Sequence, residues 1–304
     1  MKKHVAVLMG GWSAEREVSL VSGRECAIAL REKGYGVSEI DVTPDIATIL
    51  TRNKPDVIFN ALHGRFGEDG RIQGLLDIIG IPYTHSGMLA SAIAMDKVAA
   101  KRLFTAVGLP CPEGRTVNRE ELLKGDPLPR PYVVKPINEG SSVGVAIVRH
   151  GDNTSPFDTS WPYADQVMVE PYIPGRELTA AVMGARSLCV TELRPKAGFY
   201  DYSAKYEEGR TVHICPAELP PMVAQRVLDI ALAAHQALGC RGVSRADFRY
   251  DDTVGHDPTK VMLLEINTQP GMTPLSLVPE QARHCGISFP DLVGWMVENA
   301  ACDA

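Results

Sequence analysis

The first 95 residues alternate apolar runs with a helical stripe, a pattern that predicts a β-α-β-β arrangement. Strands that alternate with a helix indicate a parallel sheet, whose ligands gather beyond the carboxyl ends of the strands. We therefore expect the turns at 10–11 and 63–64 to lie near one crevice. Strands are expected at 5–9, 37–42 and 56–61, with a helix at 15–33.

The rest of the chain has longer stretches of strand pattern without helices between them, which indicates antiparallel sheets and an α+β organisation. The pattern divides the chain into three predicted units, 1–95, 96–180 and 181–304. Ser288 is the expected cap of a last helix that starts near residue 290. The other expected elements are helices at 95–107 and 221–238 and strands at 132–136, 143–149, 166–173, 177–183, 188–194, 243–250 and 261–267.

Composition and charge narrow the possible partners and the location. The chain has 304 residues, with 31 Lys and Arg against 37 Asp and Glu, so its net charge of −6 argues against nucleic acid or an acidic membrane as a partner. Its apolar runs fall far short of the roughly 20 residues that span a bilayer. Seven cysteines without a Cys-x-x-Cys pair, and no export signal, predict reduced thiols in the cytoplasm.

A pair of carboxylates stands out in the predicted hairpin of 243–250 and 261–267. If the strands pair about His256, Asp247 faces Glu265 and Arg245 faces Asn267, all four on one side of the sheet. Facing carboxylates repel unless a cation lies between them, and hard oxygen ligands favour Mg²⁺ or Mn²⁺ over zinc. The alternative is a solvated face with a surface salt bridge through Arg245. The expected core side consists of Val243, Ala246, Phe248, Leu264 and Ile266.

A glycine-rich loop, Glu-Gly-Ser-Ser-Val-Gly at 139–144, lies between two predicted strands. Such a loop can place backbone N–H groups and hydroxyls on a phosphate, although it is not a P-loop. Taken alone, it could equally be a flexible hairpin, and Lys97 and Lys135 could be ordinary surface charges. The loop at 10–15 lacks the G-x-G-x-x-G fingerprint, which argues against a hydride-transfer enzyme.

Four ordered motifs change this picture when they are taken together. They are Gly-Gly-Trp-Ser-Ala-Glu-Arg-Glu at 10–17, His-Gly-Arg-Phe-Gly-Glu-Asp-Gly at 63–70, Lys135-Pro136 with the loop at 139–144, and Glu-Ile-Asn-Thr-Gln-Pro-Gly-Met-Thr at 265–273. The sequence resembles the D-alanine–D-alanine ligases of bacterial cell-wall synthesis almost from end to end. The resemblance implies an ATP-grasp fold with an N-terminal parallel-sheet α/β domain, and a homodimer.

The resemblance also implies a reaction in which ATP phosphorylates the carboxylate of one D-alanine and the amine of a second attacks the acyl phosphate. Phosphoryl transfer depends on positioning and charge neutralisation, which suits the residue types present. By resemblance, Arg245 neutralises the transferred phosphoryl group, and Asp247, Glu265 and Asn267 hold two Mg²⁺ ions, or Mn²⁺. The ATP contacts implied are Lys97 and Lys135 for phosphates, Glu170 for the adenine amino group, Glu177 for the ribose and Lys205 for the γ-phosphate.

For the amino acids, the resemblance implies that Glu15 pairs with the ammonium group of the first D-alanine and that His63 lies close by. Ser141 and Tyr206 are expected to form a hydrogen-bonded network between closing loops. Relatives that make D-alanyl-D-lactate carry phenylalanine at position 206, so tyrosine there predicts dipeptide formation. The contact to the second substrate is assigned to Ser276, Leu277 and Gly271.

Two other interpretations stay open. Another ATP-grasp carboxylate–amine ligase would share the metal and ATP residues but join different substrates. A nucleotide-binding module that senses ATP would bind it without turnover. Outside the family pattern, Glu15 and His63 could be capping or surface residues and Tyr206 an exposed aromatic. The segment at 151–164 matches no signature of the family, and the segment at 118–131 is short for it.

Overall fold

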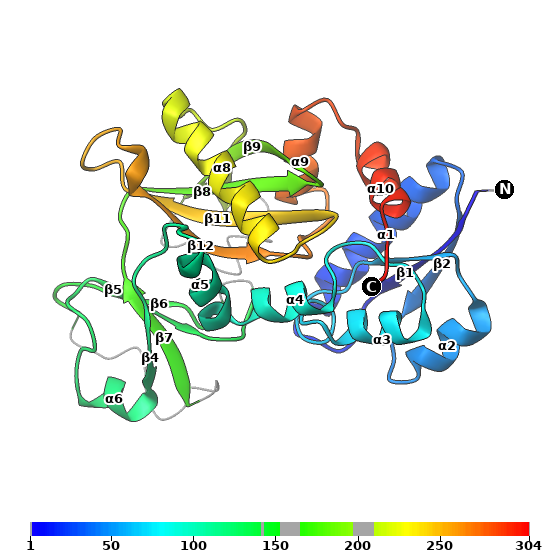
Figure 1. The fold of residues 1–304 in the computed structure, drawn as a ribbon, viewed down its shortest axis with the longest axis horizontal. Helices are drawn as coiled ribbons and strands as arrows, with labels where there is room; N and C mark the ends of the chain where they lie inside the picture. Colours follow the sequence, from blue (N-terminus) through cyan, green and yellow to red (C-terminus); the bar gives the residue numbers. More distant parts are fainter. Residues whose placement is uncertain (1, 141–142, 153–164, 197–209, 304) are drawn as a thin grey trace.

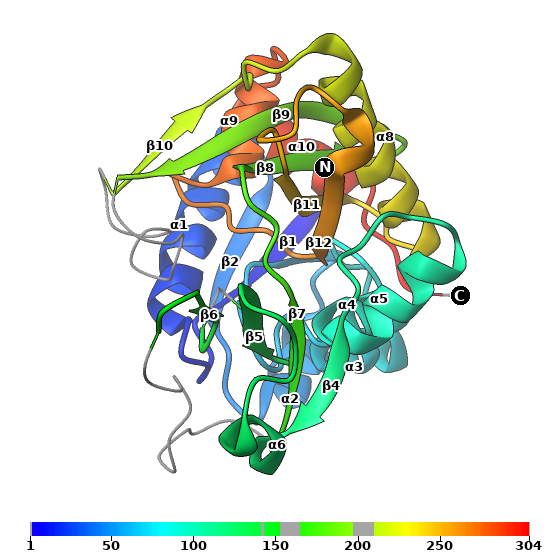
Figure 2. The same ribbon diagram turned by 90° about the vertical axis from the view of Figure 1, so that its left-hand side faces the viewer.

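The computed structural model describes residues 2–140, 143–152, 165–196 and 210–303. Three sheets organise it: an N-terminal sheet at one end, a central sheet at the other, and a C-terminal sheet between and above them (Figure 1). Seen from the side, the C-terminal and central sheets lie one above the other (Figure 2). None of the helices in the described part of the chain is long and apolar enough to cross a bilayer.

The N-terminal sheet is parallel, as predicted, with β1 between β2 and β3. The predicted β-α-β-β order was wrong in one respect, because a helix, α2, connects β2 to β3. This helix has eight residues and buries only Ile46 and Leu50, too short a stripe to stand out in the sequence. The elements are β1 His4–Met9, α1 Arg16–Glu32, β2 Gly36–Asp41, α2 Ile46–Asn53, β3 Val57–Asn60 and α3 Arg71–Ile79.

The helix expected at 95–107 is present as α5 (Lys97–Ala106), and a helix that was not predicted, α4 (Met88–Met95), directly precedes it. Asp96 separates them, because its extended backbone ends α4 and its side chain caps α5, accepting hydrogen bonds from the N–H groups of Val98 and Ala99 at 3.0 and 2.9 Å. The cap therefore places Lys97 at the first position of α5.

The central sheet is antiparallel, which confirms the prediction for this part of the chain. Its strand order is β4-β7-β5-β6, and β6 is shorter than the predicted 143–149. The sequence pattern did not reveal β4 or the short helix after it. The elements are β4 Arg115–Asn118, α6 Arg119–Lys124, β5 Tyr132–Pro136, β6 Ala146–Val148 and β7 Gln166–Pro171.

The C-terminal sheet has the order β10-β9-β8-β11-β12, and helix α8 packs against one of its faces (Figure 1). The predicted pairing of Asp247 with Glu265 and of Arg245 with Asn267 is confirmed. The elements are β8 Arg176–Met183, β9 Arg186–Pro195, β10 Thr211–Ile214, α8 Pro221–Ala237, β11 Val243–Tyr250, a 3₁₀ turn at Pro258–Lys260 and β12 Val261–Asn267.

Two details of the predicted core side of this hairpin were wrong. The register of β11 against β12 shifts between Asp247 and Phe248, so that Leu263 rather than Leu264 is fully buried. Val243 is buried, but it belongs to the cluster that contains the N-terminal strand β1, not to the cluster beneath α8.

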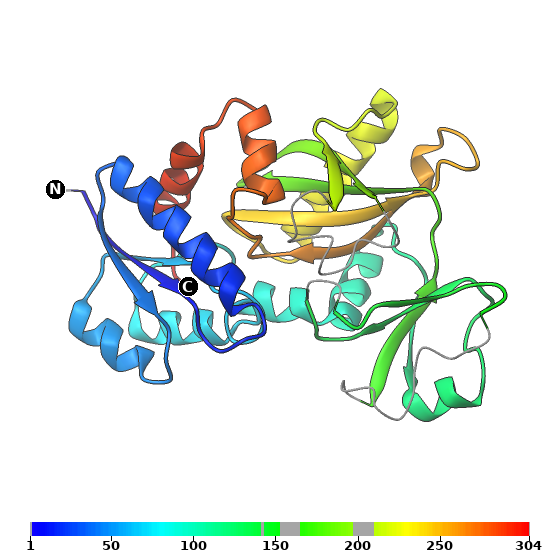
Figure 3. The ribbon, with the colours of Figure 1, turned by 180° about the vertical axis from the view of Figure 1, so that it is seen from behind.

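The last two helices, α9 (Leu277–His284) and α10 (Phe289–Glu298), join the C-terminal sheet to the N-terminal unit. Helix α10 lies beside α1 (Figure 3), and both contribute to one apolar cluster with β1 and α9. The predicted cap of α10 is confirmed, because the Ser288 hydroxyl accepts a hydrogen bond from the N–H of Asp291 at 3.2 Å. This shared core fixes the N-terminal loops against the end of β12.

Candidate active site

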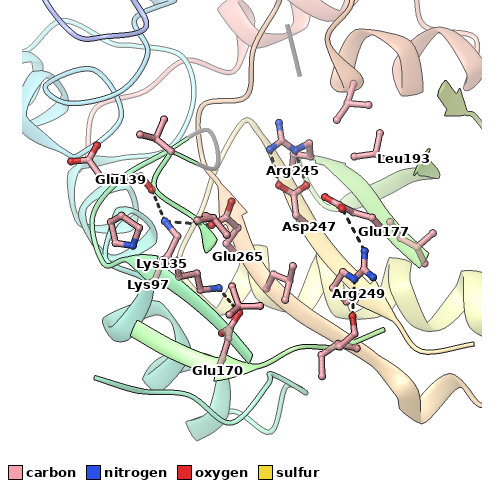
Figure 4. Close-up of a pocket in the computed structure, with 18 of the residues that line it drawn as sticks. Lys97, Lys135, Glu139, Glu170, Glu177, Leu193, Arg245, Asp247, Arg249 and Glu265 are labelled. Atoms are coloured by element: carbon pink, nitrogen blue, oxygen red, sulfur yellow. Dashed lines mark hydrogen bonds and ion pairs between the residues drawn. The ribbon is translucent and has the colours of Figure 1, made fainter. Parts of the chain in front are cut away.

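A cavity lies between the central sheet and the C-terminal sheet, and we call it the inter-sheet cavity (Figure 4). Lys135 and Glu170 come from neighbouring strands of the central sheet, whereas Arg245, Asp247 and Glu265 come from the hairpin of the C-terminal sheet. The cavity therefore brings together ionic side chains that are far apart in the sequence.

The hairpin carboxylates project into this cavity. Arg245 donates two hydrogen bonds to Asp247, from Nε to Oδ1 at 2.8 Å and from Nη2 to Oδ2 at 2.7 Å. Thr179 Oγ1 donates to Asp247 Oδ1 at 2.8 Å. Glu265 Oε2 lies 3.5 Å from the ammonium group of Lys97. Both carboxylates are thus close to cations at the edge of the same cavity.

A third oxygen donor lies nearby at the end of β12. Asn267 Oδ1 accepts a hydrogen bond from the N–H of Gln269 at 2.8 Å, which orients the amide. Among the described residues, no group of three His, Cys, Asp or Glu side chains could hold a metal, so a metal would need this amide in addition to Asp247 and Glu265. Two carboxylates and an amide oxygen are ligands that suit a hard divalent cation.

The two predicted lysines, Lys97 and Lys135, also line the inter-sheet cavity. Lys97 Nζ donates to the backbone oxygen of Glu139, at the start of the glycine-rich loop, at 2.5 Å. Lys135 Nζ donates to Glu170 Oε1 at 2.6 Å. Each lysine is 8% exposed or less. They are buried cations aimed at the cavity, and not the surface charges that the sequence alone left open.

Glu170 has a second buried partner that the sequence analysis missed. Lys101 donates to its other carboxylate oxygen. Burial raises the pKa of Glu170, but the charges of Lys135 and Lys101 together outweigh burial and hold that pKa below its usual range. At Lys101, by contrast, burial outweighs the attraction of Glu170 and lowers the pKa. The spacing could have identified Lys101 from the sequence, because Lys97 and Lys101 are four residues apart and so lie on one face of the helix.

Glu177 lies farther along the same cavity, on β8, directly opposite Arg249 on β11. Its Oε2 is 3.5 Å from Arg249 Nη1, and both side chains are about 15% exposed or less. The sequence analysis assigned no role to Arg249. The sequence could have indicated Arg249, because every second residue of a strand lies on the same face and Arg249 follows Arg245 and Asp247 at this spacing.

A second cavity, which we call the junction cavity, lies where the N-terminal loops meet the end of β12. Glu15 and His63 line it, and both are less than 10% exposed. The prediction that the turns at 10–11 and 63–64 meet near one crevice is borne out at a neighbouring hollow, which Gly10, Gly11 and His63 line. Gly64 adopts a left-handed backbone, and a Cβ there would lie 2.7 Å from Glu15 Oε2. The close approach of these two loops therefore requires glycine.

His63 is held at both ring nitrogens. Its Nδ1 is 3.0 Å from Glu68 Oε1, and its Nε2 is 3.1 Å from Ser22 Oγ. Ser22 also accepts a hydrogen bond from the N–H of Met272 at 3.3 Å, which ties helix α1 to the segment after β12. Neither Glu68 nor Ser22 was singled out from the sequence, because their chemistry depends on this tertiary contact.

The two cavities share a boundary. Lys97, Glu139, Arg245, Glu265 and Gly271 line both of them. A ligand in the inter-sheet cavity and another in the junction cavity would therefore meet beside Arg245 and Glu265.

Gly271, Ser276 and Leu277 all line the inter-sheet cavity. Ser276 Oγ accepts from the N–H of Thr273 at 2.9 Å and contacts Thr273 Oγ1 at the same distance, which closes the turn that follows β12. A Cβ on Gly271 would lie 2.9 Å from Ser276 Oγ. The segment before α9 is thus a compact turn that presents its hydroxyl and backbone near the shared boundary.

Two family models match the chain. The one described as D-ala D-ala ligase C-terminus covers residues 103–298, and the one described as D-ala D-ala ligase N-terminus covers residues 46–86. The chain belongs to the D-alanine–D-alanine ligase family. The resemblance noted from the four sequence motifs is therefore confirmed.

Individual relatives support this membership over the whole chain. The D-alanine–D-alanine ligase of Acidiphilium cryptum is 59% identical over 303 residues, and that of Methylobacterium radiotolerans is 61% identical over 305, each with 99% of both chains covered. The crystal structure of the D-alanine–D-alanine ligase of Bacillus anthracis superposes with a TM-score of 0.82 at 33% identity, covering 98% of this chain and 97% of that one. A structure of the same enzyme complexed with ATP gives 0.82 at 32% identity, with the same coverage.

The ATP-grasp fold expected for this family is likewise confirmed by these structural neighbours. Three residues that the family pattern singles out, Ser141, Lys205 and Tyr206, lie outside the described residues. Their assigned roles stay predictions, as do the roles of the described site residues and the unit boundaries at 95 and 180.

Proposed function

We propose that the protein joins two D-alanine molecules into D-alanyl-D-alanine at the expense of ATP, for the synthesis of peptidoglycan precursors. The single observation that carries this proposal is the shared boundary of the two cavities at Lys97, Arg245 and Glu265. A reaction between a nucleotide phosphate and an amino-acid carboxylate needs such a meeting point. Family membership supports the choice of substrates.

ATP is proposed to occupy the inter-sheet cavity. Lys97 and Lys135 supply buried positive charge for its phosphates, and Glu177 accepts hydrogen bonds from the ribose hydroxyls. The adenine amino group is assigned to the side of the cavity where Glu170 lies. Because Lys101 and Lys135 keep Glu170 ionised, its carboxylate can act only as a hydrogen-bond acceptor there.

A divalent cation fits the hairpin end of this cavity. Asp247, Glu265 and Asn267 offer oxygen ligands on adjacent strands in confirmed register, and no imidazole or thiolate belongs to the set. These residues are proposed to hold two Mg²⁺ ions, or Mn²⁺. When bound, the ions neutralise phosphate charge. Binding requires Asp247 to share its carboxylate between Arg245 and the metal, and both of its oxygens can accept more than one partner.

The first D-alanine is proposed to lie in the junction cavity, with its ammonium group paired to Glu15 and its carboxylate toward the shared boundary. An oxygen of that carboxylate attacks the γ-phosphorus, and the bond from phosphorus to the ADP oxygen breaks. His63, fixed between Glu68 and Ser22, keeps the loop beside Glu15 in place. Arg245 lies where negative charge gathers on the transferred phosphoryl group.

The second D-alanine is assigned to the turn that contains Gly271, Ser276 and Leu277. Its ammonium group must lose a proton before the nitrogen attacks the acyl carbon, after which phosphate leaves and the peptide bond remains. Lys205 is proposed to contact the γ-phosphate, and Ser141 with Tyr206 to link the loops over the reactants. Tyrosine at 206 supports D-alanine over D-lactate as this second substrate.

Two finer proposals follow from the family and from the chemistry. Because ATP and free D-alanine are substrates, we place the protein in the cytoplasm. We also propose a homodimer, on the family resemblance alone.

An amino-acid panel tests the proposed function. Phosphate release from ATP with a magnesium salt should rise strongly with D-alanine, and much less with L-alanine, glycine or D-lactate. No stimulation by D-alanine would contradict the proposal. Stimulation by a different acid would favour another carboxylate–amine ligase, and ATP binding without turnover would favour an ATP-sensing module.

A further inference from the structure

Arg249 forms one end of the inter-sheet cavity. It lies on β11 two residues beyond Asp247, on the same face of the strand, and its register partner on β8 is Glu177. Its side chain is only 14% exposed. A charged group so deeply placed needs partners, because an unpaired buried charge is strongly unfavourable.

Those partners come from the segment that links β7 of the central sheet to β8 of the C-terminal sheet. Arg249 Nε donates to the backbone oxygen of Ile173 at 3.0 Å, and Nη2 donates to that of Gly175 at 2.8 Å. Nη2 also lies 3.3 Å from Tyr172 Oη, and the guanidinium carbon is 5.5 Å from the centre of the Tyr172 ring. Two backbone carbonyls and an aromatic face therefore fix the plane of the guanidinium group.

The remaining nitrogen, Nη1, faces Glu177 at 3.5 Å from Oε2 (Figure 4). At this distance and degree of burial, the attraction between the two charges is strong enough to restrict where the carboxylate points. An arginine suits the task, because its rigid fork can bind the two carbonyls and still present an N–H toward the carboxylate. A lysine in the same place could not satisfy all of these partners.

We propose that Arg249 is a positioning residue for Glu177. Held by the linker carbonyls, it orients the Glu177 carboxylate to accept hydrogen bonds from the two ribose hydroxyls, and so sets the preference for ribonucleotides over 2′-deoxyribonucleotides. The inference rests on the proposed function in one respect, namely that Glu177 receives the ribose of ATP.

Three variants separate this role from a merely structural one. Arg249→Met removes the guanidinium group, and Arg249→Lys keeps the charge without the fork. Arg176→Met is the matched control: Arg176 is a similarly buried arginine beside Glu177 in the sequence, but it pairs with Glu192 and does not line the cavity. Thermal melting of each variant checks that it is folded.

The readout is the binding of ADP and of 2′-deoxy-ADP with a magnesium salt, measured by calorimetry. We expect the unmodified protein to bind ADP about tenfold more tightly than 2′-deoxy-ADP, as a charge-assisted hydrogen bond implies. Arg249→Met should reduce that preference to about twofold or less, chiefly by weakening ADP binding. The preference of Arg249→Lys should lie between those of the unmodified protein and Arg249→Met. In turnover, KM for ATP should rise while kcat at saturating ATP changes little.

The inference is overturned if Arg249→Met keeps the preference for ADP, or if Arg176→Met loses it to the same extent. It is also overturned if a folded Arg249→Lys binds both nucleotides as the unmodified protein does. Because binding requires neither D-alanine nor turnover, this result is independent of the amino-acid panel. Failure of the panel would contradict the proposed function and leave the nucleotide comparison interpretable.

Discussion

The inter-sheet cavity and the junction cavity are built in different ways. In the first, ion pairs of strand residues set the positions of the side chains: Lys135 on β5 with Glu170 on β7, and Arg245 with Asp247 on β11. In the second, hydrogen bonds between loops and helices do so, as His63 shows with Ser22. A triphosphate with its metal ions brings many charges, whereas an amino acid brings only two. The contrast indicates that each cavity is matched to the charge of its proposed ligand.

Among the substitutions considered, the loss of one hairpin carboxylate should have the largest effect on turnover. Glu265→Gln is expected to lower kcat by about 10²–10³-fold, because it removes a charge at the boundary of both cavities and a proposed metal ligand. Phosphate release at saturating ATP and D-alanine measures it. Thermal melting should be nearly unchanged, and Glu120→Gln, an exposed residue, serves as the control. Near-normal turnover would contradict the metal assignment.

The buried ion pairs of the inter-sheet cavity should matter to stability as well. Glu170→Gln leaves Lys101 and Lys135 buried without their shared counter-charge, and we expect it to lower the free energy of unfolding by about 3 kcal/mol. Urea denaturation measures this change. Glu121→Gln, which breaks a surface pair with Arg115, should cost less than about 1 kcal/mol.

The difference in unfolding free energy between the unmodified protein and Glu170→Gln should depend on pH. The pKa of Glu170 is held below its ordinary value of 4.5, so the folded state binds this proton less readily than the unfolded chain does. Its contribution to stability is therefore complete above about pH 4.5 and is lost as pH falls through the lower folded-state pKa. The difference in stability between the unmodified protein and Glu170→Gln should shrink in that acidic range. A difference that stays constant as pH falls would contradict the assignment.

A substitution in the junction cavity should have a smaller effect on catalysis, and it should affect the use of D-alanine without affecting nucleotide binding. Glu15→Gln is expected to lower kcat/KM for D-alanine by about 30-fold, since it removes one charge-assisted pair with the substrate ammonium group. ADP binding should be unaffected. The control is Glu17→Gln, an exposed residue in the first turn of α1, the helix that Glu15 precedes. Equal losses toward ADP and D-alanine would mean that the two cavities do not divide the substrates in this way.

Much of the fold could be predicted because hydrophobic periodicity and a single hairpin register determine it. Once β11 and β12 pair about residue 256, the positions of Arg245, Asp247 and Glu265 follow. The bulge after Asp247 breaks that regularity, which explains why Leu264 was placed in the core. Short helices such as α2 bury too few side chains to give a periodic signal.

Site residues could be predicted from the sequence where local spacing or a family motif identifies them. Residues whose role depends on tertiary contacts could not be predicted in this way. Lys101 and Arg249 continue patterns that begin at Lys97 and Arg245, but only the folded chain shows their partners, Glu170 and Glu177. Ser22 lies 41 residues from His63 in the sequence, and no local pattern links them. Contacts of this kind depend on how α1 packs against the segment after β12.

The central claim is that a nucleotide phosphate and an amino-acid carboxylate react at the boundary of the two cavities. D-alanine labelled with ¹⁸O in its carboxylate tests this claim most directly, with the released phosphate analysed by mass spectrometry. An acyl phosphate transfers one labelled oxygen to phosphate for each dipeptide formed, and we predict this result. Dipeptide formation with unlabelled phosphate would contradict the account.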